Sequence, residues 1–243
     1  MILNNSLKLI KKNIRHFYLN SNLYNKKITP FSVGLIEYQP SPSLLDCLIK
    51  YDKKKVNIEN YSLNEIWNNP NLKKKDQQNL NSFFWLFSLD LRSSKKDTQN
   101  IIYQWINTND RYNSKNWTID IIGKRIIAWI SNSRLTYEDG SIDYKDKFNS
   151  IIKKQINHLI NEIETSELIN NKIVGCAAII LTGLSYPQNN NYLNSGLSLL
   201  KKLAKYSLDN NGFPKSRNAR QLSFYLKYFI LIREWFKESQ NEI

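Results

Sequence analysis

The sequence predicts an all-α protein made of antiparallel helical hairpins, preceded by an irregular N-terminal segment. From residue 76 onward, apolar residues recur at the three- and four-residue spacing of a buried helix face. Short polar connectors such as Asp139–Ser141 and Asn189–Asn191 separate these stretches, and short connections favour antiparallel neighbours. No exact repeat of fixed period occurs, which disfavours a regular helical solenoid. We expect two parts, residues 1–72 and a helical domain over residues 73–243.

The N-terminal part begins with an amphipathic helix over residues 2–19. Its apolar residues share one face and its basic residues lie on the others: Leu3, Leu7, Ile10, Ile14 and Phe17 against Lys8, Lys11, Lys12 and Arg15. A basic amphipathic helix can lie on a membrane surface. More commonly its apolar stripe packs on its own protein, and we expect packing here. Residues 20–72 are expected to wrap against the helical domain, with a strand or an extended stretch over residues 31–38.

Seven helices are predicted in the helical domain from apolar periodicity and the polar turns between periodic stretches. Their approximate ranges are residues 76–91, 97–107, 119–130, 144–164, 168–184, 192–208 and 218–237. The helix over 168–184 is apolar on most sides, and such a helix belongs at the centre of a protein. Its Gly175 and Gly183, together with Ala177 and Ala178, permit a close approach of neighbouring helices.

Composition and charge narrow the classes of partner. The net charge of +14 is of the sign that attracts nucleic acid and other polyanions. The lysines are scattered along the chain, however, whereas a nucleic-acid footprint clusters on one face or helix. We therefore favour diffuse solvated charge over a nucleic-acid site. No apolar run is long enough for a transmembrane helix, and the first helix lacks the apolar core of a signal peptide. A cytoplasmic location is expected, with the periplasm as the alternative.

The sequence offers no metal or cofactor site. Cys47 and Cys176 are the only cysteines, and they lie far apart without nearby histidines. This pattern fits neither a zinc site nor a disulfide framework, so we expect two buried reduced thiols. The chain also lacks a glycine-rich phosphate loop and the strand-to-helix serine motif of the hydrolases.

One loop near the C-terminal end has a more specific chemistry. It follows the helix over 192–208 and contains an Asn-Asn-Gly turn, Pro214, and a polar tip with Arg217 and Asn218. Asn and Gly tolerate positive φ, and a proline prevents helix continuation, so the stretch predicts a tight helix end and an irregular loop. Two interpretations are open. The loop presents Arg217 and Asn218 to a ligand, or it is a plain helix–helix connection whose arginine pairs with a neighbouring carboxylate.

The same loop resembles one in the heparinase II/III-like polysaccharide lyases. Gly212, then Ser216-Arg217-Asn218, then Leu222 is similar to the Gly-Gly-His-x-Ser-Arg-Asn or Gly-Asn-His-x-x-x-Asn-Ala-Arg stretch that opens a helix in that family. Two upstream blocks add to the resemblance. Residues 83–92 resemble its aromatic helix of pattern Phe-x-Trp-Leu-x-Asp-Leu-Arg. Trp117, Asp120, Arg125 and Trp129 resemble a Trp…Asp…Arg-x-x-x-Trp helix.

This resemblance implies an incomplete (α/α) toroid and a uronate-containing polysaccharide as partner. Lyases of the family perform β-elimination, a carbon–oxygen bond cleavage that needs a carboxylate-neutralising group, a base and an acid. In this chain Phe213 and Pro214 stand where the family has Asn or Gly and His, so the catalytic residues are unknown. The C-terminal β-sandwich of the family does not follow the last helix. We expect either a portion of a longer lyase-type protein or a helical domain without its lyase partner.

The residues expected to bind the polysaccharide are Arg217, Asn218, Arg125 and Trp117, lining one concave groove. His158 and Tyr225 are expected to be packed or hydrogen-bonded in the core. Most of the six tryptophans sit at helical spacing among aliphatic residues, which predicts core packing, and Trp117 is the best cleft candidate because it precedes a helix. The rival hypothesis is a non-catalytic helical scaffold for another protein, which would show an exposed apolar patch.

Overall fold

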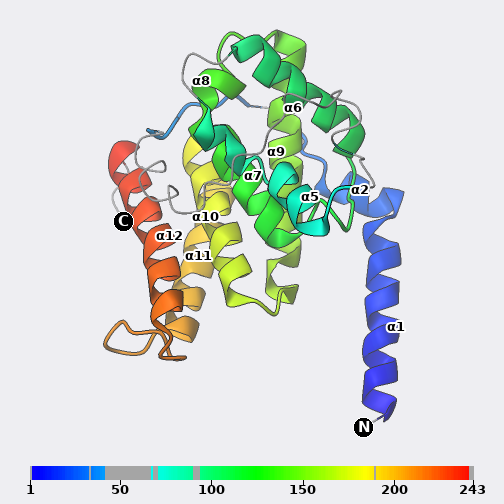
Figure 1. Cartoon of the computed structure of the whole chain (residues 1–243), viewed down its shortest axis with the longest axis vertical. Helices are drawn as coiled ribbons and strands as arrows, with labels where there is room; N and C mark the ends of the chain where they lie inside the picture. The colour runs from blue at the N-terminus through cyan, green and yellow to red at the C-terminus, as the bar shows by residue number, and fades with distance from the viewer. Residues whose placement is uncertain are drawn as a thin grey trace.

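The chain is an assembly of packed helices from which one N-terminal helix extends (Figure 1). The computed structural model describes residues 2–32, 34–41, 67, 71–89, 94–188 and 190–240. These residues are mostly helical and contain no β-strand, which confirms the all-α class. Cys47 and the Asp90-Leu91-Arg92 part of the aromatic block lie outside the described residues.

The bounds of the described helices are α1 (Ile2–Leu19), α2 (Asn22–Ile28), α5 (Lys74–Asn81), the 3₁₀ helix η2 (Phe84–Ser88), α6 (Lys95–Asn109), α7 (Ile119–Ser131), α8 (Ser133–Thr136), α9 (Ile142–Glu162), the 3₁₀ helix η3 (Ile163–Thr165), α10 (Ile169–Ser185), α11 (Asn190–Ser207) and α12 (Ala219–Glu238). The last six predicted helices are present in order as α6, α7, α9, α10, α11 and α12, with boundaries close to those expected, and α2 and α8 are additional.

The helix expected over residues 76–91 is broken in two, and this expectation was wrong. α5 ends at Asn81, and Phe83 takes a left-handed φ of 56° before η2 begins. Carbonyls that would extend the helix are used elsewhere. Leu80 O accepts the indole N–H of Trp85, and Asn81 O accepts from Arg125 on α7. The tertiary hydrogen bonds therefore compete with helix continuation at this point.

α10 is the central helix, as its apolar surface predicts. It packs against α7, α11 and α12, and its side chains from Ile173 to Leu184 are buried. Its glycines permit the close contacts. A Cβ on Gly183 would lie 2.5 Å from the backbone nitrogen of Leu193, so α10 and α11 touch nearly backbone to backbone. Cys176 is buried on α10, and burial raises the pKa of its thiol to about 12.

The segment before the helical body has no strand in its described part. α2 packs on α9, where Tyr24 and Ile28 are buried. Residues 34–41 then run along the end of the body in an irregular conformation. Glu37 N–H donates to Ser185 O at 2.9 Å, and Tyr38 donates its hydroxyl to Glu238 on α12 at 2.8 Å.

The expected packing of the first helix is not observed. α1 has the predicted range, but Ile10, Ile14 and Phe17 on its apolar stripe are exposed. In Figure 1, α1 points away from the body and meets it only near its C-terminal end. α1 contacts α2, which in turn packs on α9. Leu19, the last residue of α1, is buried, so among the described side chains of the helix only the C-terminal end is covered.

Candidate functional site

The loop over residues 208–218 joins α11 to α12 and has a defined shape. Leu208 and Pro214 face each other as an isolated antiparallel bridge, and Pro214 is buried while the tip of the loop is exposed. Gly212 has a φ of 79°, in the region that glycine tolerates best. The irregular loop with a glycine turn that the sequence predicts is therefore present.

Asp209 organises the tip of this loop. One carboxylate oxygen, Oδ1, accepts the backbone N–H groups of Asn211 and Phe213, both at 2.9 Å. The other, Oδ2, lies 2.7 Å from Nη1 of Arg217. The hydrogen bond from Phe213, with those from Asn211 and Arg217, holds the pKa of Asp209 below its ordinary value.

The two loop residues expected to bind substrate are both engaged within the protein. Arg217, at a φ of 57°, forms the ion pair with Asp209. Asn218 is the N-cap of α12, and its Oδ1 accepts the N–H groups of Arg220 at 2.9 Å and Gln221 at 3.4 Å. These contacts match the plainer interpretation, a helix–helix connection with an arginine–carboxylate pair. Both side chains remain exposed to solvent.

Arg125 and Trp117 are not at the surface. Both side chains are fully buried, and the indole N–H of Trp117 donates to Asn109 O at 3.3 Å. A side chain without solvent exposure cannot contact a polysaccharide, so these two residues do not line a groove with Arg217 and Asn218. All six tryptophans are buried, which corrects the expectation that Trp117 lies in a cleft.

Arg125 is held by backbone carbonyls and an aromatic ring. Its Nε donates to Asn81 O at 2.8 Å and its Nη2 to Asn116 O at 2.7 Å. The guanidinium lies 3.9 Å from the centre of the Trp105 ring. Nη1 has no hydrogen-bond partner, and no carboxylate among the described residues pairs with the side chain. Burial lowers the pKa of Arg125 well below its ordinary value. The arginine joins α5, α6 and α7.

The proton-transfer candidates of the sequence are also in the core. His158 is buried on α9, and its Nδ1 lies 2.7 Å from the Tyr24 hydroxyl. Burial lowers the pKa of His158 to about 4, so the ring is neutral at neutral pH. Tyr225 is buried on α12. The packed or hydrogen-bonded roles expected for both residues are confirmed. His16 is exposed on α1, beside Asn20.

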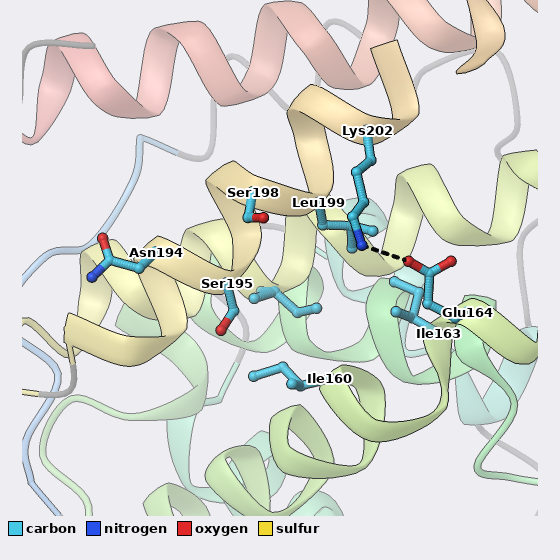
Figure 2. A pocket seen from close by; sticks show the side chains of 9 residues that line it. Ile160, Ile163, Glu164, Asn194, Ser195, Ser198, Leu199 and Lys202 are labelled. Carbon is cyan, nitrogen blue, oxygen red and sulfur yellow. Dashed lines mark ion pairs between the residues drawn. The ribbon is translucent and has the colours of Figure 1, made fainter. Parts of the chain in front are cut away.

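A concave surface does lie beside the loop, along α11. Two adjoining hollows of about 470 and 620 Å³ share Glu164, Leu199 and Lys202 in their walls. We call their combined surface the α11 groove. Its walls are formed by Ile160, Ile163, Glu164, Glu167, Ile169, Lys172, Ile179, Asn194, Ser195, Ser198, Leu199, Lys202, Leu203, Lys205, Tyr206 and Lys215. Figure 2 shows one end of the groove, with Ser195 and Lys202 of α11 on one side and Ile160 and Glu164 on the other.

Four lysines converge on the larger hollow of the α11 groove: Lys172 from α10, Lys202 and Lys205 from α11, and Lys215 from the loop. Glu164 lies 3.5 Å from both Lys172 and Lys202. The ammonium groups of Lys205 and Lys215 pair with no carboxylate in the described part of the chain, and Lys215 donates to the backbone oxygen of Lys205 at 2.9 Å. The exposed ring of Tyr206 lies at the same hollow.

Sequence reasoning missed this groove. The polar side of α11 carries a usable signal, because Asn194, Ser198, Lys202 and Lys205 follow one another at helical spacing along one face. The remaining walls come from Glu164 on η3, from α10 and from the loop. Only the fold brings these segments together.

In the part of the chain that the structure describes, no three histidine, cysteine or acidic side chains are grouped as a metal site would require. The described helices are all too short or too polar to cross a bilayer. Comparisons with models of protein families, with curated proteins and with solved structures find no match to this chain.

Proposed function

We propose that this chain binds an acidic, uronate-containing polysaccharide in the α11 groove and at the adjoining loop. The observation that carries the proposal is the convergence of Lys172, Lys202, Lys205 and Lys215 on one hollow. We further propose that α10, α11 and α12 belong to an incomplete (α/α) toroid of heparinase II/III-like type. The short connections between these packed helices and the loop motif at residues 212–222 support this.

The lining of the α11 groove matches the chemistry of such a ligand. Lysine ammonium groups attract carboxylates and sulfates as point charges. The hydroxyl of Ser195 and the amide of Asn194 suit sugar hydroxyls, and the exposed ring of Tyr206 suits the apolar face of a sugar. Glu164 holds two of the lysines through long ion pairs in which its own carboxylate is largely exposed. Such pairs are worth about 0–1 kcal/mol, so a ligand carboxylate can replace Glu164.

The proposal is binding and not β-elimination. Phe213 and Pro214 occupy the loop positions at which the resembling lyases carry Asn or Gly and His, and neither side chain transfers a proton. His158 is buried against Tyr24 and does not reach the groove surface. If the Arg217 side chain releases Asp209, it can neutralise a ligand carboxylate. This contact would raise affinity without transferring a proton.

The test is a calorimetric titration of the full chain with heparan sulfate and with alginate. The groove variant Lys205→Ala/Lys215→Ala should bind at least one of these polymers about tenfold more weakly than the parent chain, equivalent to about 1.4 kcal/mol. The matched control is Lys74→Ala/Lys96→Ala, which removes two exposed lysines from α5 and α6. Both variants lose the same net charge, so non-specific attraction falls equally in the two.

Equal weakening in the two variants, or no binding by the parent chain, would contradict the proposal. An absorbance assay for unsaturated uronates accompanies the titration. We expect no rise in absorbance. A rise that Arg217→Ala abolishes would instead show that the chain is an active lyase.

A second candidate function is a helical scaffold for another protein. The observation in its favour is that Leu226 and Ile230, one turn apart on α12, are exposed, as is Phe213 on the loop. Leu226→Ser/Ile230→Ser distinguishes the two functions, because it removes exposed apolar surface without changing the net charge. This variant should leave polysaccharide affinity unchanged if the α11 groove is the binding site.

A further inference from the structure

The first described residues carry an unusual share of the exposed apolar surface. Half of the large apolar side chains that are exposed in the described part of the chain lie between residues 10 and 35. They are Ile10, Ile14, Phe17, Tyr18, Leu23, Phe31 and Leu35. Isolated exposed apolar residues are ordinary on protein surfaces. Those on α1 are different, because Ile10, Ile14 and Phe17 follow the spacing of one helix face and form a stripe.

The same segment is uniformly basic. Residues 1–36 contain no aspartate or glutamate, and Glu37 is the first acidic residue of the chain. The basic residues in this range are Lys8, Lys11, Lys12, Arg15, Lys26 and Lys27. Only Arg15 is matched by an acidic partner among the described residues, since its Nε lies 2.9 Å from Glu162 on α9. Lys11, Lys26 and Lys27, whose side chains the structure describes, are exposed and available to an anionic surface.

α1 receives little support from the rest of the protein. An isolated helix of this length is marginal in water, because most helical stability comes from packing of an apolar face. Along α1, that face is in contact with solvent from Ile10 to Phe17. In Figure 1 the helix stands clear of the body, so its stripe is open to a large flat surface. A partner that covers the stripe would supply the missing packing.

We propose that α1 is a docking helix for an anionic lipid surface. It lies in the plane of the headgroups, with Ile10, Ile14 and Phe17 in the acyl boundary and the lysines against the lipid phosphates. Charge selects this partner, because a basic flank with no acid over 36 residues complements anionic lipid. The apolar stripe favours lipid over a soluble polyanion, because only lipid offers an apolar region in which the stripe can be buried. The proposal is independent of polysaccharide binding, which involves α11 and the loop.

The experiment is flotation of the full chain with vesicles. One set contains phosphatidylcholine alone and the other contains phosphatidylcholine with phosphatidylglycerol. The chain should float with the anionic set, and raised salt should weaken binding because the Debye length shortens from about 10 Å at 0.1 M to about 3 Å at 1 M. Ile14→Asp/Phe17→Asp should lower the partition coefficient about tenfold or more.

A matched control is available on the helical body. Ile142 and Phe17 are both 81% exposed, and Leu168 and Ile14 are 63% and 65% exposed. Ile142→Asp/Leu168→Asp therefore adds the same charge at equally exposed apolar positions. Both changes lie at helix N-termini, where aspartate is favoured. This control should float like the parent chain, and circular dichroism should show folded protein for both variants.

Three outcomes would overturn the proposal. The first is that the parent chain stays in solution with anionic vesicles. The second is that the α1 variant floats as well as the control. The third is that Ile14→Asp/Phe17→Asp keeps the full salt-sensitive binding to anionic vesicles, which would show that charge alone binds the chain to lipid. Sedimentation of the parent chain and the α1 variant without lipid completes the test. A dimer that Ile14→Asp/Phe17→Asp converts to monomer, with no flotation, would assign the stripe to a second copy of the chain.

Discussion

The guanidinium groups of Arg125 and Arg217 lie in opposite environments. Arg125 is buried without a carboxylate, and its partners are two backbone carbonyls and the face of Trp105. Arg217 is exposed at a loop tip and pairs with the carboxylate of Asp209. The buried contacts cannot be exchanged, because the carbonyls have no water to replace the arginine. The exposed pair can be exchanged for solvent or ligand at little cost.

This difference gives Arg125 a structural role and leaves Arg217 as the arginine for which the proposed ligand can compete. Both belong to blocks that resemble the same lyase family, and the sequence alone assigns both to the ligand. Burial assigns Arg125 to the junction of α5, α6 and α7. Only Arg217 is left where an anionic ligand can compete for it. A block that resembles a family motif can therefore contain residues that build the scaffold.

The largest expected effect is on stability when each arginine is replaced by alanine in turn. Arg125→Ala leaves the carbonyls of Asn81 and Asn116 unpaired and opens a cavity beside Trp105. It should lower the free energy of unfolding by about 3–5 kcal/mol. Arg217→Ala should lower it by about 0–1 kcal/mol, because its ion pair is largely exposed. Urea denaturation of the full chain measures both values.

A similar loss in the two variants would contradict the distinction between them. Arg125→Met separates the packing contribution of Arg125 from its hydrogen bonds. Methionine fills much of the same volume but donates no hydrogen bond, so the stability that it recovers measures packing, and the remaining loss measures the orphaned carbonyls.

The pH dependence of stability should also differ between the core and the loop. Burial holds the pKa of His158 at about 4 in the folded chain, against 6.5 for an unperturbed histidine. The unfolded chain therefore binds a proton between these values that the folded chain does not. Stability from this residue is fully present above about pH 6.5 and is lost as the pH falls toward about 4, by about 3 kcal/mol in all.

His158→Gln removes the titrating group while keeping a polar side chain near the Tyr24 hydroxyl. Its free energy of unfolding should depend less on pH across this window than that of the parent chain. Chemical denaturation at several pH values compares the two. Parallel curves would contradict the lowered pKa, because they would show that His158 binds its proton equally well in the folded and unfolded chains.

The fold was predictable where the residues of one segment are sufficient to indicate its burial. α10 is apolar on most sides, and the structure places it at the centre. The break at Phe83 was not predictable, because it depends on Arg125 reaching the carbonyl of Asn81, 44 residues away. The exposed stripe of α1 follows the same rule. Its amphipathic pattern is visible in the sequence, but the pattern does not reveal that Ile10, Ile14 and Phe17 find no packing partner in the described part of the chain.

The candidate site also has a part that the sequence predicts and a part that it does not. The loop was predictable, since Gly212 and Pro214 act on the backbone next to them. The α11 groove was not, since its lysines come from two helices and a loop that only the tertiary structure assembles. Burial of Arg125 and Trp117 was likewise not predictable. An arginine within a helix and a tryptophan just before one have the same sequence pattern in a cleft and in a core.

The last prediction concerns the carboxylate that Arg217 shares with the loop backbone. Asp209 accepts two backbone N–H groups besides its ion pair, so it should control the loop conformation more than Arg217 does. In amide hydrogen exchange, Asp209→Ala should release the protection of Asn211 and Phe213, whereas Arg217→Ala should largely preserve it. Neither variant should expose the core, because the loop tip lies outside it.

Acid should reproduce the effect of Asp209→Ala. The pKa of Asp209 is lowered in the folded chain, first by the hydrogen bond from Phe213. Its carboxylate therefore contributes order above the ordinary aspartate range, and that order is lost as the pH falls through the lowered pKa. The amide resonances of Asn211 and Phe213 should move in this range in the parent chain and stay still in Asp209→Asn. If they also move in Asp209→Asn, another group controls the loop, and the exposed ion pair of Arg217 is then a consequence of loop shape and not a part of its cause.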